Sequence, residues 1–97
     1  MDLRLYNTLT GAVQPLLPEK PPEVRMYLCG LTVYSRGHVG NYRTFVMVDL
    51  LRRTLRYKGL AVREVMNITD VDDRIIRSAQ EAGQDLQTFT AAHIQSF

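Results

Sequence analysis

The sequence has 97 residues, of which 45% are apolar and 23% charged, and it carries a formal net charge of +2. This length suits one small domain and excludes a complete large enzyme, and the apolar share excludes a disordered chain. One cysteine and two histidines exclude an internal disulfide and a structural zinc site, and the lack of a signal-like or membrane-spanning apolar run predicts a cytoplasmic protein.

Two strand-like segments at the start of the chain predict a β-hairpin. Residues 3–7 and 12–16 flank a short turn in which Gly11 is available for a positive φ. All four prolines follow within residues 15–22, a composition that is typical of an extended connector. We therefore assign residues 1–22 to a hairpin and a proline-rich connector.

Residues 23–67 are expected to form one βαβ unit. Residues 24–29 are mostly apolar and predict a strand buried on both faces of a parallel sheet. A helix is expected from about Asn41, with Gly59 as its left-handed C-terminal residue. Four residues at spacings of three to four form the apolar stripe of this helix: Phe45, Val48, Leu51 and Leu55. Residues 60–67 predict the second strand, reached by a right-handed crossover.

Residues 68–97 predict two helices. Thr69 or Asp70 can cap the first, with Gly83 beyond its end. Its apolar face would consist of Val71, Ile75, Ile76 and Ala79. Asp85 can cap the second, whose apolar side would carry Leu86, Phe89 and Ile94. No closing pattern follows the last helix, so we expect the fold to continue past Phe97.

The loop of residues 32–41 is the first candidate for chemistry. It joins the carboxyl end of a strand to the amino end of a helix, which is where ligands bind in open α/β sheets. Free N–H groups of the helix suit a phosphate, Gly37 and Gly40 allow close approach, and His38 could donate to the same phosphate. A tight turn with His38 on the surface is the alternative.

Two further segments could line the same cleft. Cys29 at the strand end could bind a metal or attack a substrate, or could be a buried apolar side chain. Residues 67–73 follow the second strand and could present polar groups beside the first loop, or serve only as a helix cap.

Cations and one further histidine have simpler interpretations. The cations Arg52, Arg53, Arg56 and Lys58 lie toward the end of the main helix, where they complement its dipole, with a phosphate contact as the alternative. His93, four residues after Phe89, is expected to be a partly exposed packing residue.

Four motifs follow one another along the chain: LYNTLT at residues 5–10, MYLCGLTVY at 26–34, HVGNYRT at 38–44 and NITDVDD at 67–73. In this order and at these spacings they closely resemble the amino-terminal part of cysteinyl-tRNA synthetases, a class I family. The resemblance covers essentially the whole chain. It implies an α/β fold, with residues 1–97 as the first βαβ unit of an incomplete Rossmann-like (HUP-type) parallel sheet, preceded by a hairpin and followed by helices.

The resemblance also implies an activity. Such enzymes activate cysteine with ATP to form cysteinyl-adenylate and pyrophosphate, and then transfer the cysteinyl group to tRNA(Cys). The residue that matches Cys29 is one of four zinc ligands in the family, and the zinc binds the substrate thiol; zinc's preference for sulfur separates cysteine from serine. The implied cysteine-binding positions are Cys29, Gly30, Thr32 and Thr69. The implied ATP-binding positions are Tyr34, Gly37, His38, Gly40 and Asn41, of which His38 and Asn41 would be catalytic.

Two positions depart from the family pattern. Asn41 stands where the family signature has a second histidine, although its amide can still donate a hydrogen bond. Ser35 stands where family members often have an acid.

The expected activity belongs to a longer parent. The other zinc ligands, the second half of the catalytic fold and the anticodon-binding region would lie beyond Phe97, so the chain alone should not aminoacylate tRNA. One alternative is a related cysteine ligase that acts on an amino-sugar acceptor, as in mycothiol biosynthesis. Another is a free-standing module that binds nucleotide or tRNA, or that self-associates through uncovered apolar surface.

Overall fold

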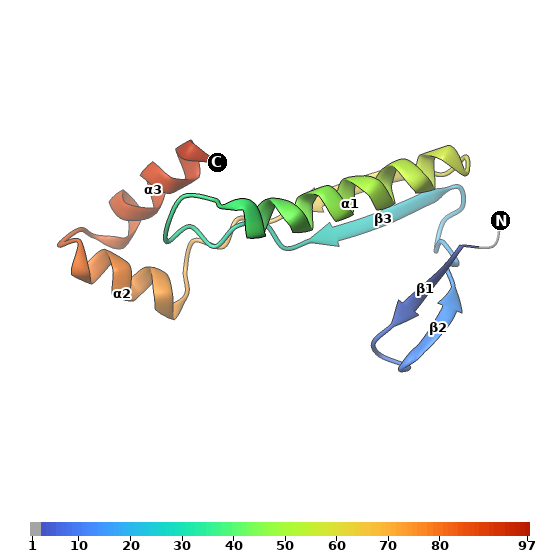
Figure 1. Ribbon diagram of the computed structural model, residues 1–97, viewed down its shortest axis with the longest axis horizontal. Coiled ribbons are helices and arrows are strands. Elements are labelled where there is room, and N and C mark those ends of the chain that lie inside the picture. The colour runs from blue at the N-terminus through green and yellow to red at the C-terminus, as the bar shows by residue number, and fades with distance from the viewer. Residues whose placement is uncertain (1–2) are drawn as a thin grey trace.

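A computed structural model describes residues 3–97 as two small sheets and three helices (Figure 1); the first two residues of the predicted 1–22 segment lie outside this range. In chain order the elements are β1 (Arg4–Asn7), β2 (Ala12–Pro15), β3 (Glu23–Leu28), α1 (Val39–Tyr57), β4 (Ala61–Met66), α2 (Asp73–Glu81) and α3 (Leu86–Ser96). The predicted α/β class is confirmed, and none of the described helices is long and apolar enough to cross a membrane.

The predicted hairpin is present. Strands β1 and β2 are antiparallel, with Arg4 opposite Pro15 and Asn7 opposite Ala12. Gly11 closes the turn with a φ of 67°, and its N–H donates to the carbonyl oxygen of Asn7 at 2.8 Å. A β-carbon disfavours such a positive φ, so the glycine is required by the turn. The connector that follows contains a cis peptide bond between Pro21 and Pro22.

The βαβ unit forms the centre of the molecule. Strands β3 and β4 are parallel over their whole length, from Glu23 opposite Ala61 to Leu28 opposite Met66. Helix α1 packs on one face of this pair, where Val24 and Leu55 are buried. The helix begins at Val39, earlier than predicted, because His38 serves as its N-cap. The predicted left-handed residue after the helix is confirmed by Gly59, with a φ of 81°.

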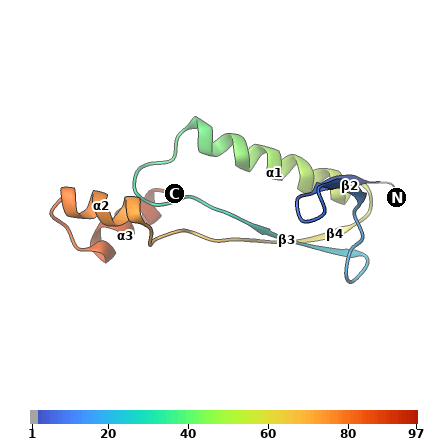
Figure 2. The ribbon, with the colours of Figure 1, turned by 90° about the horizontal axis from the view of Figure 1, so that it is seen from below.

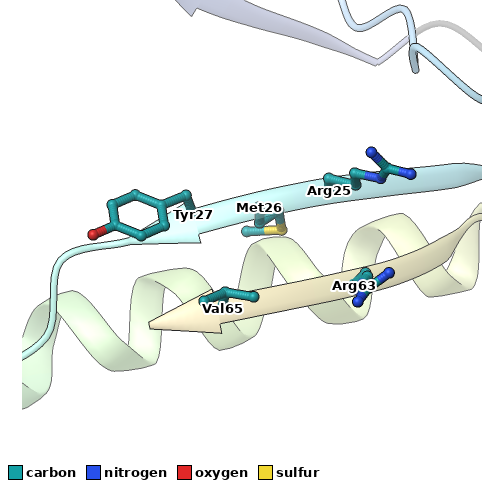
Figure 3. Close-up of a pocket in the computed structure, with 5 residues that line it drawn as sticks. All are labelled: Arg25, Met26, Tyr27, Arg63 and Val65. Atoms are coloured by element: carbon teal, nitrogen blue, oxygen red, sulfur yellow. The ribbon is translucent and has the colours of Figure 1, made fainter. Parts of the chain in front are cut away.

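The expectation that β3 is buried on both faces is wrong. Helix α1 covers one face only, and the other face is open, with Tyr27 70% and Val65 54% exposed. Figure 3 shows side chains of both strands on this face, with helix α1 behind the sheet. Parallel strands are usually covered on both sides, but within residues 3–97 no second layer packs on this sheet.

Helices α2 and α3 form a separate apolar cluster with the loop that follows β3. Val33 of the loop packs against Ile75, Ala79 and Phe89, and all four side chains are buried. The predicted cap of α3 by Asp85 is confirmed, since its carboxylate accepts the N–H of Thr88 at 3.0 Å.

Helix α2 differs from the prediction at its start and along its face. Its cap is Asp72, whose side chain accepts the N–H of Ile75 at 2.8 Å, and not Thr69 or Asp70. Thr69 instead extends the parallel pairing beyond the strands, which delays the start of the helix. Three residues assigned to the apolar faces are exposed: Val71, Ile76 and Ile94.

The molecule is elongated. In Figures 1 and 2 the α2–α3 pair lies beyond one end of the βαβ unit and the hairpin lies beside the other end, and the molecule measures 53 × 27 × 25 Å. Its radius of gyration is 17.3 Å, against about 13 Å for a compact domain of this length. The elongated shape leaves much apolar surface uncovered.

Candidate functional site

The segments that follow β3 and β4 lie side by side. Thr32 and Thr69 form an isolated parallel bridge beyond the strand ends. The N–H of Val33 donates to the carbonyl oxygen of Thr69 at 3.0 Å. The N–H of Thr69 in turn donates to the carbonyl oxygen of Leu31 at 2.9 Å. Two of the predicted cysteine-binding positions are therefore held together at the carboxyl edge of the sheet.

The amino end of α1 is closed by a reciprocal pair of hydrogen bonds. Nδ1 of His38 accepts the N–H of Gly40 at 3.1 Å, and Oδ1 of Asn41 accepts the N–H of His38 at 3.0 Å. A neutral imidazole that accepts at Nδ1 carries its proton on Nε2, which makes Nε2 the donor. The first turn of α1 contains no acidic residue, so nothing there offsets the attraction of the helix end for an anion.

A hollow of about 200 Å³ connects the strand end to the helix start. It is lined by Cys29, Gly30, Leu31, Asn41, Thr44 and Phe45. The cysteine is free and exposed, so its interpretation as a buried apolar side chain is wrong. The hollow brings a thiol and the amide of Asn41 to one surface, and Asn41 links that surface to His38.

Asn67 ties the end of β3 to the turn after β4. Its Oδ1 accepts the N–H of Gly30 at 2.9 Å, and its Nδ2 lies 3.5 Å from Oγ1 of Thr69. A β-carbon on Gly30 would overlap the carbonyl oxygen of Asn67. The glycine is required here by close backbone approach and not by its own backbone conformation.

Of the five predicted ATP-binding positions, only Asn41 lines this hollow; Tyr34, Gly37, His38 and Gly40 do not. Tyr34 packs against the α2–α3 cluster, where the guanidinium of Arg74 lies 5.8 Å from the centre of its ring. A β-carbon on Gly37 would lie 3.0 Å from the Tyr42 hydroxyl. The structure therefore joins Cys29, Gly30 and Asn41 at the hollow and leaves the other four ATP-binding positions, and also Thr32 and Thr69, outside its lining.

Two of the cations near the end of α1 are engaged in ion pairs. Asp49 binds Arg53 at 2.6 Å and also binds Arg52, whose Nε lies 3.9 Å from Glu64. The hydrogen bonds from Arg53 and Arg52 lower the pKa of Asp49. These pairs favour a structural role for the two arginines over a phosphate contact.

His93 is half-buried, and its ring packs edge-on against that of Phe89, with 4.8 Å between the ring centres. This is the contact expected of a packing residue.

The described residues do not fit a complete zinc site. Among residues 3–97 no group of three or more metal-binding side chains comes together. Cys29 supplies one thiolate, whereas a tetrahedral zinc needs four ligands.

A second depression lies on the open face of the sheet. It has a volume of about 480 Å³ and is lined by Arg25, Met26, Tyr27, Arg63 and Val65 (Figure 3). Arg25 and Arg63 are register partners, and Arg25 also binds Glu23 at 2.8 Å, which lowers the pKa of that carboxyl. None of the ATP-binding or cysteine-binding positions implied by the family resemblance lines this depression.

In open α/β sheets, ligands bind where a helix begins beside the carboxyl ends of parallel strands, and this unit has that layout. The family model described as "tRNA synthetases class I (C) catalytic domain" matches residues 15–97, and the chain belongs to this family. This finding confirms the resemblance stated from the sequence.

Curated relatives point to one member of that class. The chain is 50% identical over 97 residues to the cysteine–tRNA ligase of Koribacter versatilis, covering all of this chain and 20% of the relative. It is 50% identical to that of Solibacter usitatus, with all of this chain and 21% of the relative covered. It is 48% identical over 95 residues to that of Methanosarcina mazei, and the match covers 98% of this chain and 20% of the relative. The chain thus spans about a fifth of the length of these relatives.

Two features of the site were missed by the sequence analysis. Thr44 and Phe45 line the hollow, although Phe45 was assigned only to the apolar stripe of the helix. Asn67 was included in a polar motif without a role of its own. The sequence shows only that Asn67 directly follows a strand. This position does not indicate which backbone groups its side-chain amide contacts.

Proposed function

We propose that this chain forms the part of a cysteine–tRNA ligase catalytic domain that binds ATP and cysteine. In the complete enzyme the cysteine carboxylate attacks the α-phosphate of ATP, forming cysteinyl-adenylate and releasing pyrophosphate, and the cysteinyl group then passes to tRNA(Cys). The family membership and the names of the relatives support this proposal. The structural observation that carries it is the bridge between Thr32 and Thr69 near the capped end of α1.

We assign the phosphates of ATP to the amino end of α1. The positive end of the helix dipole attracts an anion, while the N–H groups of Gly40 and Asn41 already donate to His38. His38 has Nε2 as its donor, so it stabilises the charge that develops on the α-phosphate in the transition state. The amide of Asn41 lines the adjoining hollow and holds His38 in place. Tyr34 and Gly37 stay proposed ATP-binding positions, although both lie outside the lining of the hollow.

We assign cysteine to the edge between the two strands, against Gly30, Thr32 and Thr69. Cys29 supplies a single thiolate beside them, and a zinc ion there would draw its other ligands from outside the described residues. We further propose that β3, α1 and β4 are the first unit of a Rossmann-like (HUP-type) sheet. A related ligase with an amino-sugar acceptor would use the same half-reaction, and only the acceptor of the cysteinyl group separates it from the tRNA ligase.

Cysteine-dependent exchange of pyrophosphate into ATP tests the proposal. The 97-residue chain alone is expected to give no exchange, because catalysis needs groups that the rest of the domain supplies. The chain is then grafted in place of the matching residues of the Koribacter versatilis ligase, to which it is 50% identical. This graft should exchange with cysteine and not with serine.

Substitution of the two histidines sharpens this test. His38→Ala in the graft should lower the exchange rate by about 10²- to 10³-fold, the usual effect of removing a donor to a developing charge. His93→Ala is the matched control, because His93 packs against Phe89 in α3 and does not line the hollow. Equal losses in the two variants, or exchange with serine at the same rate, would contradict the assignment.

A second candidate property concerns the chain by itself. Tyr27 and Val65 are exposed on a sheet face with no cover among residues 3–97, and the outer edges of β3 and β4 are unpaired there. Open edges and large apolar patches promote association. We propose that two copies of the chain associate through this face when the rest of the catalytic domain is absent.

A further inference from the structure

Asn67 makes three separate contacts with the end of β3. Its backbone N–H donates to the carbonyl oxygen of Leu28 at 3.2 Å, and its Oδ1 accepts the N–H of Gly30 at 2.9 Å. Its own carbonyl oxygen occupies the space that a β-carbon on Gly30 would need. One residue after β4 therefore fixes the position of the chain where it leaves β3.

The same side chain also reaches toward the second segment of the site. Nδ2 of Asn67 lies 3.5 Å from Oγ1 of Thr69, longer than the usual limit of about 3.2 Å, so the hydrogen bond to this hydroxyl is a weak one. A hydroxyl that accepts from an amide keeps its own hydrogen free to donate elsewhere. Asn67 thus places the backbone of Gly30 and leaves the Thr69 hydroxyl as a donor.

We propose that Asn67 is a positioning residue for the cysteine site, holding Gly30 and Thr69 at a fixed spacing and orienting the Thr69 hydroxyl toward the ligand. This inference rests on the proposed function, in which those two residues contact cysteine. Asn67 does not contact the ATP side of the site through any of these bonds. Its loss should therefore weaken the binding of cysteine and leave that of ATP unchanged.

Two substitutions separate the two tasks of the side chain. Asn67→Ala removes both the acceptor for Gly30 and the donor to Thr69. Asn67→Asp keeps an acceptor for Gly30 but has no donor, so the Thr69 hydroxyl would turn to donate to the carboxylate. Asn7→Ala is a matched control, because Asn7 also accepts a backbone N–H, from Leu9 at 3.0 Å, and donates to Gln14 at 2.9 Å.

The first measurement uses the 97-residue chain and the amide resonance of Gly30. Asn67→Ala removes the acceptor, so the Gly30 amide resonance should shift and its hydrogen exchange should become faster. In Asn67→Asp and Asn7→Ala the shift and the exchange rate of the Gly30 amide should stay as in the parent chain. Amide resonances of α1 and α3 report whether each variant is folded. An unchanged Gly30 resonance in a folded Asn67→Ala would overturn the proposal.

The second measurement determines KM values in the graft described above. Asn67→Ala and Asn67→Asp should each raise the KM for cysteine about tenfold, the size expected for an unpaired polar group, and leave the KM for ATP unchanged. An unchanged KM for cysteine, or an equal rise in both KM values, would overturn the positioning role. An inactive parent graft would instead refute the proposed function, and the inference with it, so the two failures are distinguishable.

Discussion

Asn41 and His38 cap one another at the start of α1: the side-chain oxygen of Asn41 accepts the N–H of His38 at 3.0 Å. In the same turn the imidazole of His38 accepts the N–H of Gly40. The residue proposed to act on phosphate is therefore held by the helix whose end would bind that phosphate. Asn41, the departure from the family signature, has a structural role at the site.

Removal of the Asn41 side chain should destabilise the chain. Asn41→Ala leaves the N–H of His38 without its partner and should lower the free energy of unfolding by about 1 kcal/mol, the usual effect of losing a cap. Asn41→Glu keeps an acceptor at the position typical of a capping box and should retain stability. Urea denaturation followed by circular dichroism measures both. Equal stability of Asn41→Ala and the parent would show that the cap contributes nothing.

Gly30 should tolerate no side chain. Gly30→Ala would drive a methyl group into the carbonyl oxygen of Asn67, and we expect a loss of about 1–3 kcal/mol in the free energy of unfolding. Gly37→Ala is the control, since its nearest neighbours are side-chain atoms of Tyr42 and Leu31, which can move. Thermal unfolding of the two variants compares them. A smaller loss for Gly30→Ala than for Gly37→Ala would contradict the close approach.

The cap of α3 should give a pH dependence on the acid side. The hydrogen bonds from the hydroxyl and the N–H of Thr88 hold the pKa of Asp85 below its ordinary value. The unfolded chain then binds more protons in this range, so the contribution of Asp85 to stability is complete above the unfolded pKa of about 4 and is lost as the pH falls through the lower folded pKa.

Titration of the Asp85 carboxyl by NMR measures this effect. Thr88→Val removes the hydroxyl bond and should move the midpoint toward the ordinary value. Thr90→Val is the matched control in the same helix, because the Thr90 hydroxyl donates to the carbonyl oxygens of Leu86 and Gln87. The account of this cap would be wrong if Thr88→Val and Thr90→Val titrated alike.

Self-association through the open sheet face should depend on Val65. Sedimentation of the chain should give an average mass that rises with protein concentration. Val65→Lys should shift the chain toward monomer, because it replaces an apolar side chain by a further cation beside Arg25 and Arg63, which raises the cost of burying this face. Val13→Lys in the hairpin is the control, since Val13 and Val65 are each 54% exposed. A parent chain that stays monomeric at all concentrations would contradict the prediction.

Much of the fold follows from local signals in the sequence. Gly11, Gly59 and Gly83 were placed correctly after a strand or helix, and all three have a positive φ, which few other residues adopt. Asp85 was correctly assigned as a cap because an acid before an apolar helical pattern has few other roles. The helix–strand order around Gly59 followed from the change in apolar periodicity.

Other features depend on partners that the sequence does not specify. The cap of α2 moved to Asp72 because Thr69 continues the parallel pairing with Thr32, a long-range contact with no local signal. The open face of β3 contradicts the assignment of a strand buried on both sides and agrees with the alternative of uncovered apolar surface, because an apolar strand indicates that cover is needed but not whether it is supplied. Asn67 could be placed near the site, but its bond to Gly30 required the strand register.

Titration of the 15N-labelled chain with ATP tests the central claim most directly, because we assign ATP to the start of α1, beside the hollow at Asn41, and not to the larger depression on the open sheet face. Amide shifts at Val39, Gly40 and Asn41, the first turn of α1, are the predicted result, even for weak binding. Shifts confined to Arg25, Tyr27 and Val65 on the open sheet face would contradict the account.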